Sequence, residues 1–572
     1  MLFKTLKKQG KYSFSNARSD FLAGLIVAVM LIPQGMAYAL LAGLPPIYGL
    51  YAGLTPLLIY PFLGSSKHLS VGPAALMALI IYSGLSSMAE PMSERFIELA
   101  ITTAFVAGCI QVILSIIRMG YLVNFLSRPV IRGFTTAAAL IIIMSQLRYL
   151  LGVETERSGS TLLNAYQLIT HLDGIQWMTT AFGVVSLGFI FWVKFSGRKL
   201  PASLLMVTLS SIIVYSMGWE SGDMKLIGSV PTGLPHFMLP DLRLSTLWQV
   251  MPIAAVVCLI SFIESLSVAK VIAAKSDSAA ISGNRELWAL GWSKIISAFF
   301  QSFPNTGSFS RTALNAEAGA RTELASIWTA VFTGTGLLFF TSLFYYVPQT
   351  VLAAVVIGSV VSLVDIREAR NLLSRDPKDF YVFMLTFGLT VAFGILEGVL
   401  AGVILSLIFI LYKASRPHFA ELGALPESAI YKSVSRFESA EAQSNCLIFR
   451  YDADLFFANA EHFYENIVKA SREKEGLKAV IIDASAIGSV DSTGIAQLKL
   501  LKEAADRAKI KLFITGLKGP VRDIFRRHQV FSWLPLENFF LNVDLAMSKI
   551  NNETAKSLPY PEKVKEDERG SI

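Results

Sequence analysis

The sequence predicts a polytopic α-helical membrane protein that carries a smaller α/β domain at its C-terminal end. Hydrophobic residues make up 53% of the 572 residues and charged residues only 16%, against about 25% charged residues in a soluble domain. Apolar runs of about 20 residues, the length that crosses hydrocarbon as a helix, recur along the chain. These runs stop after Arg416-Pro417, where charged residues become frequent.

Residues 21–416 are the expected transmembrane domain, and a basic arm, residues 1–20, precedes them. The apolar pattern predicts about fourteen helical segments. The segments at Pro73 and Arg311 are expected to be too short to cross the membrane, because Gly and Pro interrupt both surroundings. The expected segment starts are Phe21, Ile47, Pro73, Ile97, Pro129, Trp177, Ser203, Trp248, Glu286, Arg311, Glu323, Pro348, Lys378 and Glu397.

Lysine and arginine residues predict the orientation in the membrane. They gather in the N-terminal arm and in connections near residues 194–199, 367–378 and 413–416. With an even number of spans, all of these lie on the cytoplasmic side of a multi-pass cell-membrane protein, and both termini are cytoplasmic. The same loops account for the net charge of +8, so the lipid bilayer and not nucleic acid is the expected partner. No Cys/His spacing suggests a metal site, and no cofactor is expected.

Residues 417–552 have the pattern of an α/β domain. The segments NCLIFRY, KAVIIDAS and IKLFITG are expected strands. They alternate with the expected helices AEHFYENIVKASREK, STGIAQLKLLKEAADRAK and GPVRDIFRRHQV. Residues 553–572 are charged, contain proline and are expected to be disordered.

The first expected span contains a proline and two polar residues on one face. Pro33 is predicted to kink the helix. Gln34 and Tyr38 are four residues apart and share a helical face. Their side chains offer donors to an anion. The alternative is that both bond to backbone groups that Pro33 leaves unpaired.

Two interrupted segments, one in each half of the chain, predict the transport site. HLSVGPAALMAL places Gly72-Pro73 before an apolar helix, and PNTGSFSRTALN places Gly307, Ser308 and Ser310 before another. Paired broken helices indicate an inverted-repeat transporter with its site at the midplane. Free N–H groups and the positive end of the helix dipole favour an anion there. Arg311 adds a positive charge, unless it lies at the interface or pairs with a structural carboxylate.

Glu264 is the single acidic residue of an otherwise apolar span, VVCLISFIESLSVAKVIA. A charged carboxylate is costly in such a span, so Glu264 is a candidate proton carrier. It is equally a candidate Na⁺ ligand or a counter-ion for Arg311. A position at the lipid interface is the remaining alternative.

At these residues the sequence resembles the SulP family of anion permeases, the sulfate permease group. The resemblance covers PIYGLYAGLTPLLIYPFLGSSK, PQGMAYA, SVGPAA and GSFSRTALN, and the tail resembles the STAS domain that ends most members. It implies two inverted repeats of seven segments each, with a core domain that moves against a gate domain. It also implies a transporter, not an enzyme, for sulfate, bicarbonate, chloride or dicarboxylates, and a homodimer.

The resemblance assigns roles to individual residues. Gln34 and Tyr38 would line the site from the first helix and the backbone of Ala74 and Ala75 from the third. Ser310 and Arg311 would face it from the tenth. Glu264 matches the acidic position that family members use for proton coupling. Sodium-coupled bicarbonate carriers of the family usually have Asp near there and no matching Arg, so this combination resembles the proton-coupled sulfate or dicarboxylate branch.

In the tail, the STAS resemblance rests on DASAIGSVDSTG. Thr493 occupies the position that is a phosphorylated Ser in stand-alone anti-sigma-factor antagonists. It is therefore a candidate regulatory residue in a domain that would bind a cytoplasmic protein partner. The alternative is that Ser492 or Thr493 is the N-cap of the following helix.

The leading hypothesis is proton-coupled anion uptake, with Na⁺ as the alternative coupling ion. A sodium-coupled bicarbonate transporter and an uncoupled anion exchanger or channel are rivals on the same fold. A nucleobase permease shares the architecture, but the motif from Pro46 to Lys67 and the tail speak against it. A sensor or scaffold acting through its tail is a further alternative, in which Arg311 would be dispensable.

Overall fold

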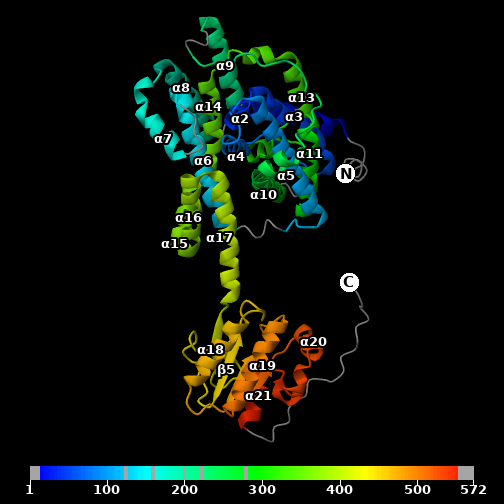
Figure 1. Cartoon of the computed structure of the whole chain (residues 1–572), viewed down its shortest axis with the longest axis vertical. Coiled ribbons are helices and arrows are strands. Elements are labelled where there is room, and N and C mark those ends of the chain that lie inside the picture. Colours follow the sequence, from blue (N-terminus) through cyan, green and yellow to red (C-terminus); the bar gives the residue numbers. More distant parts are fainter. Residues whose placement is uncertain are drawn as a thin grey trace. The chain divides into compact units, whose positions relative to one another are not determined.

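The computed structural model describes residues 13–121, 127–155, 161–196, 201–219, 224–275 and 281–551. The chain divides into two compact units, Met1–Ser406 and Leu407–Ile572 (Figure 1). Most of the expected N-terminal arm, residues 1–12, and the tail expected to be disordered, residues 553–572, lie outside the described residues.

Up to Ser415 the chain contains two successive sets of elements in the same order, and the last helix of the second set extends past the end of the first unit at Ser406. The first set is α2 (Phe14–Ala42), α3 (Pro46–Leu63), β1 (Val71–Gly72), α4 (Ala75–Leu85), α5 (Glu94–Ile116), α6 (Arg128–Leu151), α8 (Trp177–Phe195) and α9 (Ala202–Met217). The second is α10 (Leu244–Lys275), α11 (Gly283–Ala298), β2 (Thr306–Gly307), α12 (Phe309–Glu317), α13 (Leu324–Phe339), α14 (Gln349–Val360), α16 (Pro377–Phe393) and α17 (Ile395–Ser415). Each of the fourteen predicted segments therefore has a helix.

Two short helices interrupt this order, and the sequence reading did not separate them from their neighbours. They are α7 (Thr161–Thr170) and α15 (Ile366–Arg375). Helix α2 begins at Phe14, inside the segment expected as an arm, because the side chain of Ser13 accepts a hydrogen bond from the Ser15 N–H and caps it.

Strands β1 and β2 tie the two sets together at the centre of the unit. They pair antiparallel, with Val71 opposite Gly307 and Gly72 opposite Thr306. The chain thus enters α4 and α12 from opposite directions, as inverted repeats require. With 11 and 9 residues, these helices are too short to cross a bilayer, which takes about 20 residues.

The helices form two packed groups. One consists of α2, α3, α5, α10, α11 and α13, with α4 and α12 among them, and the other contains α6, α8, α14 and α16. Helix α14 also packs against α2, so these two helices lie where the groups meet. This division corresponds to the core and gate domains that the resemblance implies.

Glycines allow the first two helices of the core to touch. A Cβ atom on Gly49 of α3 would lie 1.9 Å from the carbonyl oxygen of Gly35 in α2. Real Cβ atoms do not come so close, because the atoms would overlap. Gly35 lies between Gln34 and Tyr38 in the sequence, so this contact also affects where their side chains lie.

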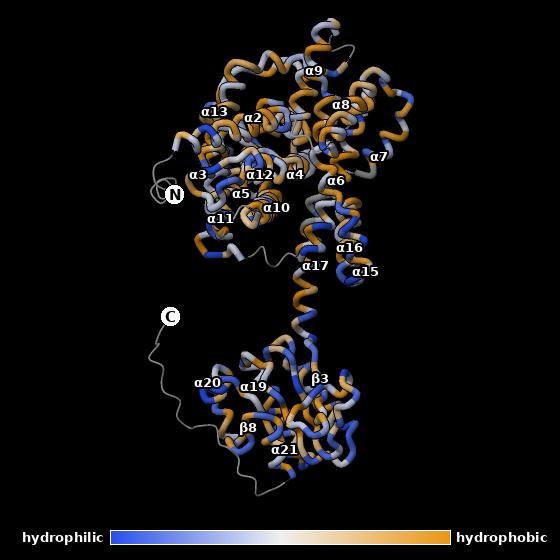
Figure 2. Tube along the Cα trace, turned by 180° about the vertical axis from the view of Figure 1, so that it is seen from behind, coloured by the Kyte–Doolittle hydropathy of each residue, from blue (hydrophilic) through white to orange (hydrophobic). Residues whose placement is uncertain are grey.

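Large apolar side chains cover the outside of the unit. Trp177, Val185 and Phe195 of α8 are 79%, 66% and 80% exposed, and Tyr381 of α16 is 70% exposed. Within the described residues, seven helices are long and apolar enough to cross a membrane. In Figure 2, orange apolar residues recur along the helices of this unit. Such exposure is stable against lipid and unfavourable in water.

The second unit is a six-stranded mixed sheet in the order β4-β3-β5-β6-β7-β8. Strands β5 to β8 are parallel, and β3 and β4 are antiparallel. The strands are β3 (Phe419–Ala424), β4 (Tyr431–Ser433), β5 (Cys446–Tyr451), β6 (Ala479–Asp483), β7 (Lys511–Thr515) and β8 (Phe539–Phe540). The helices are α18 (Ala460–Arg472), α19 (Ser492–Arg507), α20 (Gly519–Arg527) and α21 (Val543–Asn551).

Alternate residues of the central strands face opposite layers of helices. Leu447 and Phe449 pack with α18, α19 and α20, whereas Ile448 packs with α21. The predicted strands and helices of the tail are confirmed. Sequence reasoning missed β3, β4, β8 and α21, of which β4 and β8 are only three and two residues long.

Candidate functional site in the membrane unit

The two broken helices begin on either side of the β1–β2 pair. Ala74 is the N-cap of α4, and Ser308 is the N-cap of α12. Neither side chain accepts a capping hydrogen bond. The first N–H groups of both helices therefore lack a partner within the helix, and two partial positive charges meet at the centre of the unit.

These starts differ in detail from the expectation. Pro73 was expected at the first helical position, but it precedes the N-cap, and α4 begins at Ala75. The reason is that Ala74 is extended, with φ −140° and ψ 150°. Ala74 and Ala75 are both buried. Helix α12 begins at Phe309, two residues before Arg311, so Arg311 lies in its first turn.

Arg311 carries an unpaired positive charge into this centre. Its side chain is fully buried, at 0% exposure. Nη1 donates to Oε1 of Gln34 at 3.4 Å, while Nε and Nη2 have no hydrogen-bond partner. Nη2 lies over Gly72 of β1, since a Cβ there would be 3.2 Å from it. Arg311 thus reaches from α12 towards the strand that leads into α4.

Glu264 lies near Arg311 but does not pair with it. No nitrogen of Arg311 lies within 4.0 Å of the Glu264 carboxylate, although the two charges interact. Oε2 of Glu264 is buried without a hydrogen-bond partner. The ion pair considered for Arg311 is not observed. The arrangement leaves a cation, an acid and two helix starts around one point.

Tyr38 and Gln34 bond to side chains of other elements, and not to the backbone groups that Pro33 frees. The Tyr38 hydroxyl donates to Oγ of Ser359 in α14 at 2.9 Å. That bond crosses from the core group of helices to the other group. Ser310 lies 3.3 Å from Ser308, hydroxyl to hydroxyl. Gln34, Tyr38, Glu264 and Arg311 are therefore brought together, and Ser310 lies beside them on α12.

Sequence reasoning missed several polar groups around the same centre. Both side-chain polar atoms of Asn305 are buried and unpartnered, as are Oδ1 of Asn315 and Oγ of Ser70. Asn305 and Asn315 belong to the motif that contains Arg311, so an amide in an apolar surrounding was the available signal. Ser359 had no such signal, because serine is common in membrane helices.

The comparisons with known proteins agree with this geometry. Residues 18–386 match the Sulfate permease family. The chain belongs to this family. It is 34% identical over 542 residues to the protein named "Sulfate transporter 4.1, chloroplastic" from Arabidopsis thaliana, an alignment that covers 92% of this chain and 78% of that protein. It is 35% identical over 542 residues to "Probable sulfate transporter 4.2" of the same plant, covering 92% and 80%.

Solved structures share the fold of this sulfate permease family member. The murine Solute Carrier 26 family member A9 anion transporter, in the inward-facing state, superposes with a TM-score of 0.88 at 23% identity, covering 96% of this chain and 94% of that one. The transmembrane domain of the cyanobacterium bicarbonate transporter BicA superposes with a TM-score of 0.59 at 21% identity, covering 69% and 98%. The predicted architecture is confirmed.

The tail of this family member is a STAS domain, because residues 439–546 match that domain. Asp491 is the N-cap of α19, and its carboxylate accepts from the N–H groups of Gly494 at 2.8 Å and Phe457 at 2.8 Å. The N-cap role considered for Ser492 or Thr493 is therefore wrong, since a carboxylate one residue earlier takes it. Thr493 is exposed in the first turn of α19.

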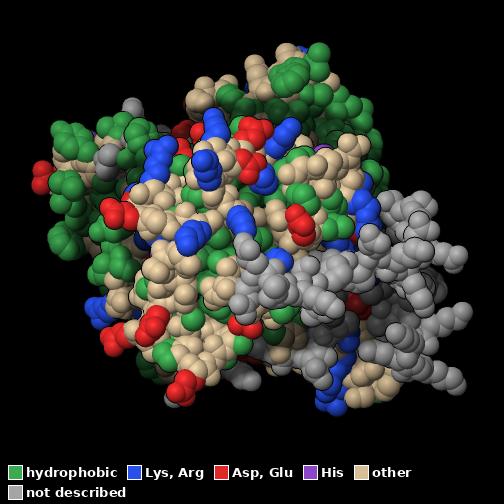
Figure 3. All heavy atoms as spheres, turned by 90° about the horizontal axis from the view of Figure 1, so that it is seen from below, with side chains coloured by type: hydrophobic (Ala, Val, Ile, Leu, Met, Phe, Trp, Pro, Cys, Tyr) green, Lys and Arg blue, Asp and Glu red, His purple; other side chains and the backbone are tan. Residues whose placement is uncertain are grey.

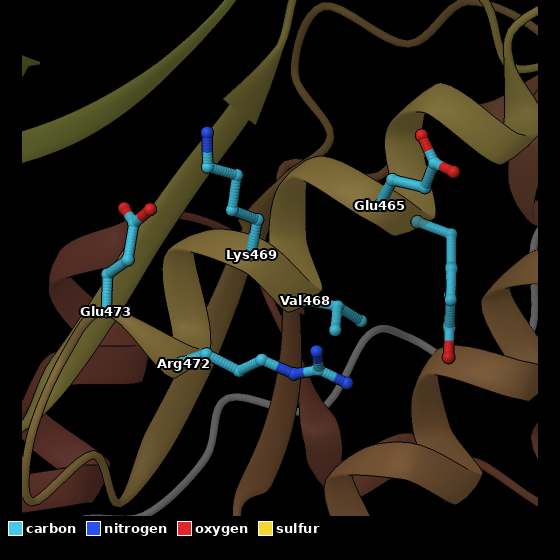
Figure 4. Close-up of a pocket in the computed structure, with 6 residues that line it drawn as sticks. Glu465, Val468, Lys469, Arg472 and Glu473 are labelled. Atoms are coloured by element: carbon cyan, nitrogen blue, oxygen red, sulfur yellow. The ribbon is translucent and has the colours of Figure 1, made fainter.

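The STAS surface is charged and mixed. Where this domain faces the viewer in Figure 3, Lys, Arg, Asp and Glu side chains are interspersed. A shallow hollow on α18 is lined by Glu465, Val468, Lys469, Arg472 and other residues (Figure 4). Its acidic and basic side chains point in different directions and do not converge on a common point. Among the described residues of the whole chain, no group of three His, Cys, Asp or Glu side chains could hold a metal ion.

Proposed function

We propose that this protein is a secondary active transporter that takes up a small inorganic or organic anion, with sulfate or a dicarboxylate as the first candidates, together with protons. The anion is held between the starts of α4 and α12 and crosses by alternating access of the two helix groups. Membership of the sulfate permease family and the names of its plant relatives support sulfate.

Arg311 is the observation that carries this proposal. An isolated Arg at the bilayer centre costs at least about 2.5–3.5 kcal/mol. Arg311 is fully buried and two of its nitrogens have no partner. A bound oxyanion supplies acceptors for both, and the N–H groups of the two helix starts supply donors to the same anion. Gln34, Tyr38 and Ser310 complete the lining, with the backbone of Ala74 and Ala75 opposite.

Glu264 is the coupling residue of the proposal. Its carboxyl interacts with the charge of Arg311 without an ion pair, so protonating it raises the net positive charge beside the anion. A proton and an anion are then bound together. Sodium coupling, and with it bicarbonate transport, is the outcome if a sodium gradient drives uptake instead. Uptake without any gradient dependence would identify an exchanger or channel.

The rest of the proposal concerns the whole chain. The transmembrane domain spans residues 21–416, with residues 1–20 before it and the STAS domain at 417–552. The protein lies in the cell membrane with both termini in the cytoplasm and forms a homodimer. Thr493 is exposed at the start of α19, where a phosphate group would meet the positive end of the helix dipole. Phosphorylation of Thr493 would then change the affinity of a cytoplasmic protein for the STAS domain.

Arg311 variants test the function directly. In proteoliposomes with an inward proton gradient, Arg311→Ala should raise the KM for labelled sulfate about 10- to 100-fold, the effect of losing a hydrogen bond to a charged group worth roughly 1.5–3 kcal/mol. The matched control is Arg132→Ala, which removes an exposed ion pair with Asp365 and should change the KM by less than about threefold. Uptake that survives in Arg311→Ala at unchanged KM would rule out the proposed site.

The substrate is identified by the same preparation. Unlabelled sulfate, fumarate, bicarbonate and chloride compete with labelled sulfate in wild type. Competition by sulfate and fumarate, and weak competition by chloride and bicarbonate, is the expected result. Strong competition by bicarbonate alone would overturn the sulfate assignment.

A further inference from the structure

Lys294 is a second buried cation of the membrane unit, and the site described above does not use it. It lies in α11 and is 0% exposed. Its Nζ donates to Oε1 of Gln111 at 3.1 Å. No carboxylate among the described residues lies within 4.0 Å of it. A buried lysine without a counter-ion is costly in a membrane protein and is a functional hypothesis by default.

Hydrogen bonds connect Lys294 to the strand beside the anion site. Helices α5, α10 and α11 pack together (Figure 1). Nε2 of Gln111 in α5 donates to Oγ of Ser261 and to the carbonyl oxygen of Cys258 in α10, both at 3.0 Å. Oγ1 of Thr306 in β2 donates to the carbonyl oxygen of Ser261 at 3.1 Å. Two residues, Gln111 and Ser261, thus connect Lys294 to Thr306 of β2 through hydrogen bonds.

The acidic residue nearest along α11 is already satisfied elsewhere. Glu286 accepts hydrogen bonds from the hydroxyl of Tyr60 at 2.9 Å and from the N–H and hydroxyl of Ser65 at 2.8 Å and 2.6 Å. It lies eight residues before Lys294 on the same helix, about 12 Å away along the axis. Glu286 therefore holds the loop after α3 and does not neutralise Lys294.

The buried charges around the site do not balance without a ligand. When both are protonated, Arg311 and Lys294 contribute two positive charges, and Glu264 is the one nearby carboxylate in the described part of this layer. When Glu264 is protonated, a dianion brings the sum to zero and a monoanion leaves one excess positive charge. A monoanion balances the same groups only when Glu264 is ionised, and it then binds without a proton. Uncompensated charge is unfavourable in a low-dielectric interior.

We propose that Lys294 is a positioning and selectivity residue that favours divalent over monovalent anions through its charge, without touching the anion. The inference rests on the proposed anion transport. In this inference Arg311 neutralises one negative charge of the dianion, and Lys294 neutralises the other from a distance. The Gln111–Ser261–Thr306 chain connects Lys294 to β2.

The test compares Lys294→Met with Lys294→Arg in proteoliposomes at clamped membrane potential. KM is measured for sulfate and for nitrate as a monovalent oxyanion. One unit charge at roughly 10 Å in a medium of effective dielectric constant about 20 changes binding about tenfold per substrate charge. Lys294→Met should therefore raise the sulfate KM about tenfold more than the nitrate KM. Lys294→Arg keeps the charge and should keep the ratio close to that of wild type.

Lys270→Met, which removes an exposed lysine of α10, is the matched control and should leave both KM values unchanged. An unchanged KM ratio in Lys294→Met, or the same ratio change in Lys294→Arg, would overturn the inference. Loss of folded protein would lower the maximal rates for both anions and leave the ratio as it was, which also counts against the inference. Failure of the proposed function would look different, because wild type itself would then not transport sulfate.

Discussion

Several polar side chains in the apolar helix bundle of this protein lack the hydrogen-bond partners that buried polar groups usually have. Arg311 has two nitrogens without a partner, and Glu264 has one oxygen without a partner. Burying each such atom without a hydrogen bond lowers the stability of the folded protein, and apolar packing does not compensate for it. The cluster is expected to be stable only because a ligand or a proton satisfies it for part of the transport cycle.

Tyr38 has two candidate roles, a hydrogen bond to Ser359 and a contact with the anion, and a single substitution can test the second. Its hydroxyl donates to Ser359 in the structure, yet it is also proposed to contact the anion. If the hydroxyl contacts the anion, Tyr38→Phe should raise the sulfate KM about 2- to 10-fold, the effect of losing a hydrogen bond worth roughly 0.5–1.5 kcal/mol.

Ser359→Ala is the control for Tyr38→Phe, since it removes the same hydroxyl–hydroxyl contact and leaves the Tyr38 hydroxyl free. It should leave the KM close to wild type in the same uptake assay. An equal rise in both variants would mean that Tyr38 acts through α14 and not on the anion.

At the scale of elements, the site depends on how closely α2 and α3 approach. Gln34 directly precedes Gly35 in α2, and the backbone of Gly49 in α3 lies against Gly35. Any side chain at this contact would push α2 away from α3 and move Gln34 relative to Arg311. Small residues at such contacts are common in membrane helices, because they allow close backbone packing.

Gly49→Ala tests this contact. The added methyl group would overlap the Gly35 carbonyl oxygen, and overpacking of this kind costs about 1–3 kcal/mol. Thermal unfolding in detergent should show a lower midpoint than wild type. Gly388→Ala is the control, because a Cβ on Gly388 of α16 meets no atom within 4 Å. Equal unfolding midpoints for the two variants would show that the close contact of α2 and α3 does not contribute to stability.

Across the whole molecule, transport requires that the two helix groups move relative to each other while the site stays intact. The β1–β2 pair joins the two broken helices within one group. The other group contributes α14, which meets α2 beside Tyr38. This placement puts the anion and Glu264 near the boundary between the groups, where occupancy and protonation can bias which side is open.

Proton coupling through Glu264 is the prediction at this scale. Wild-type sulfate uptake should rise as the external pH falls, because protonated Glu264 leaves more net positive charge for the anion. Glu264→Gln mimics the protonated form and should make uptake nearly independent of the imposed pH gradient while sulfate binding persists. Glu264→Asp, which keeps the carboxyl group, should retain the dependence. A full pH response in Glu264→Gln would exclude coupling through this residue.

The sequence by itself determined the membrane class, the fourteen helical segments, the two broken helices among them and the α/β tail, because these depend on local apolar period, helix-start signals and composition. It also indicated Gln34, Tyr38, Glu264 and Arg311, since polar residues stand out in apolar spans. Lys294 could have been found in the same way. Only the tertiary structure decided which of them meet: Arg311 bonds to Gln34 and not to Glu264, Tyr38 reaches Ser359, and Asp491 caps α19. Contacts between residues hundreds of positions apart follow from packing, and no local pattern encodes them.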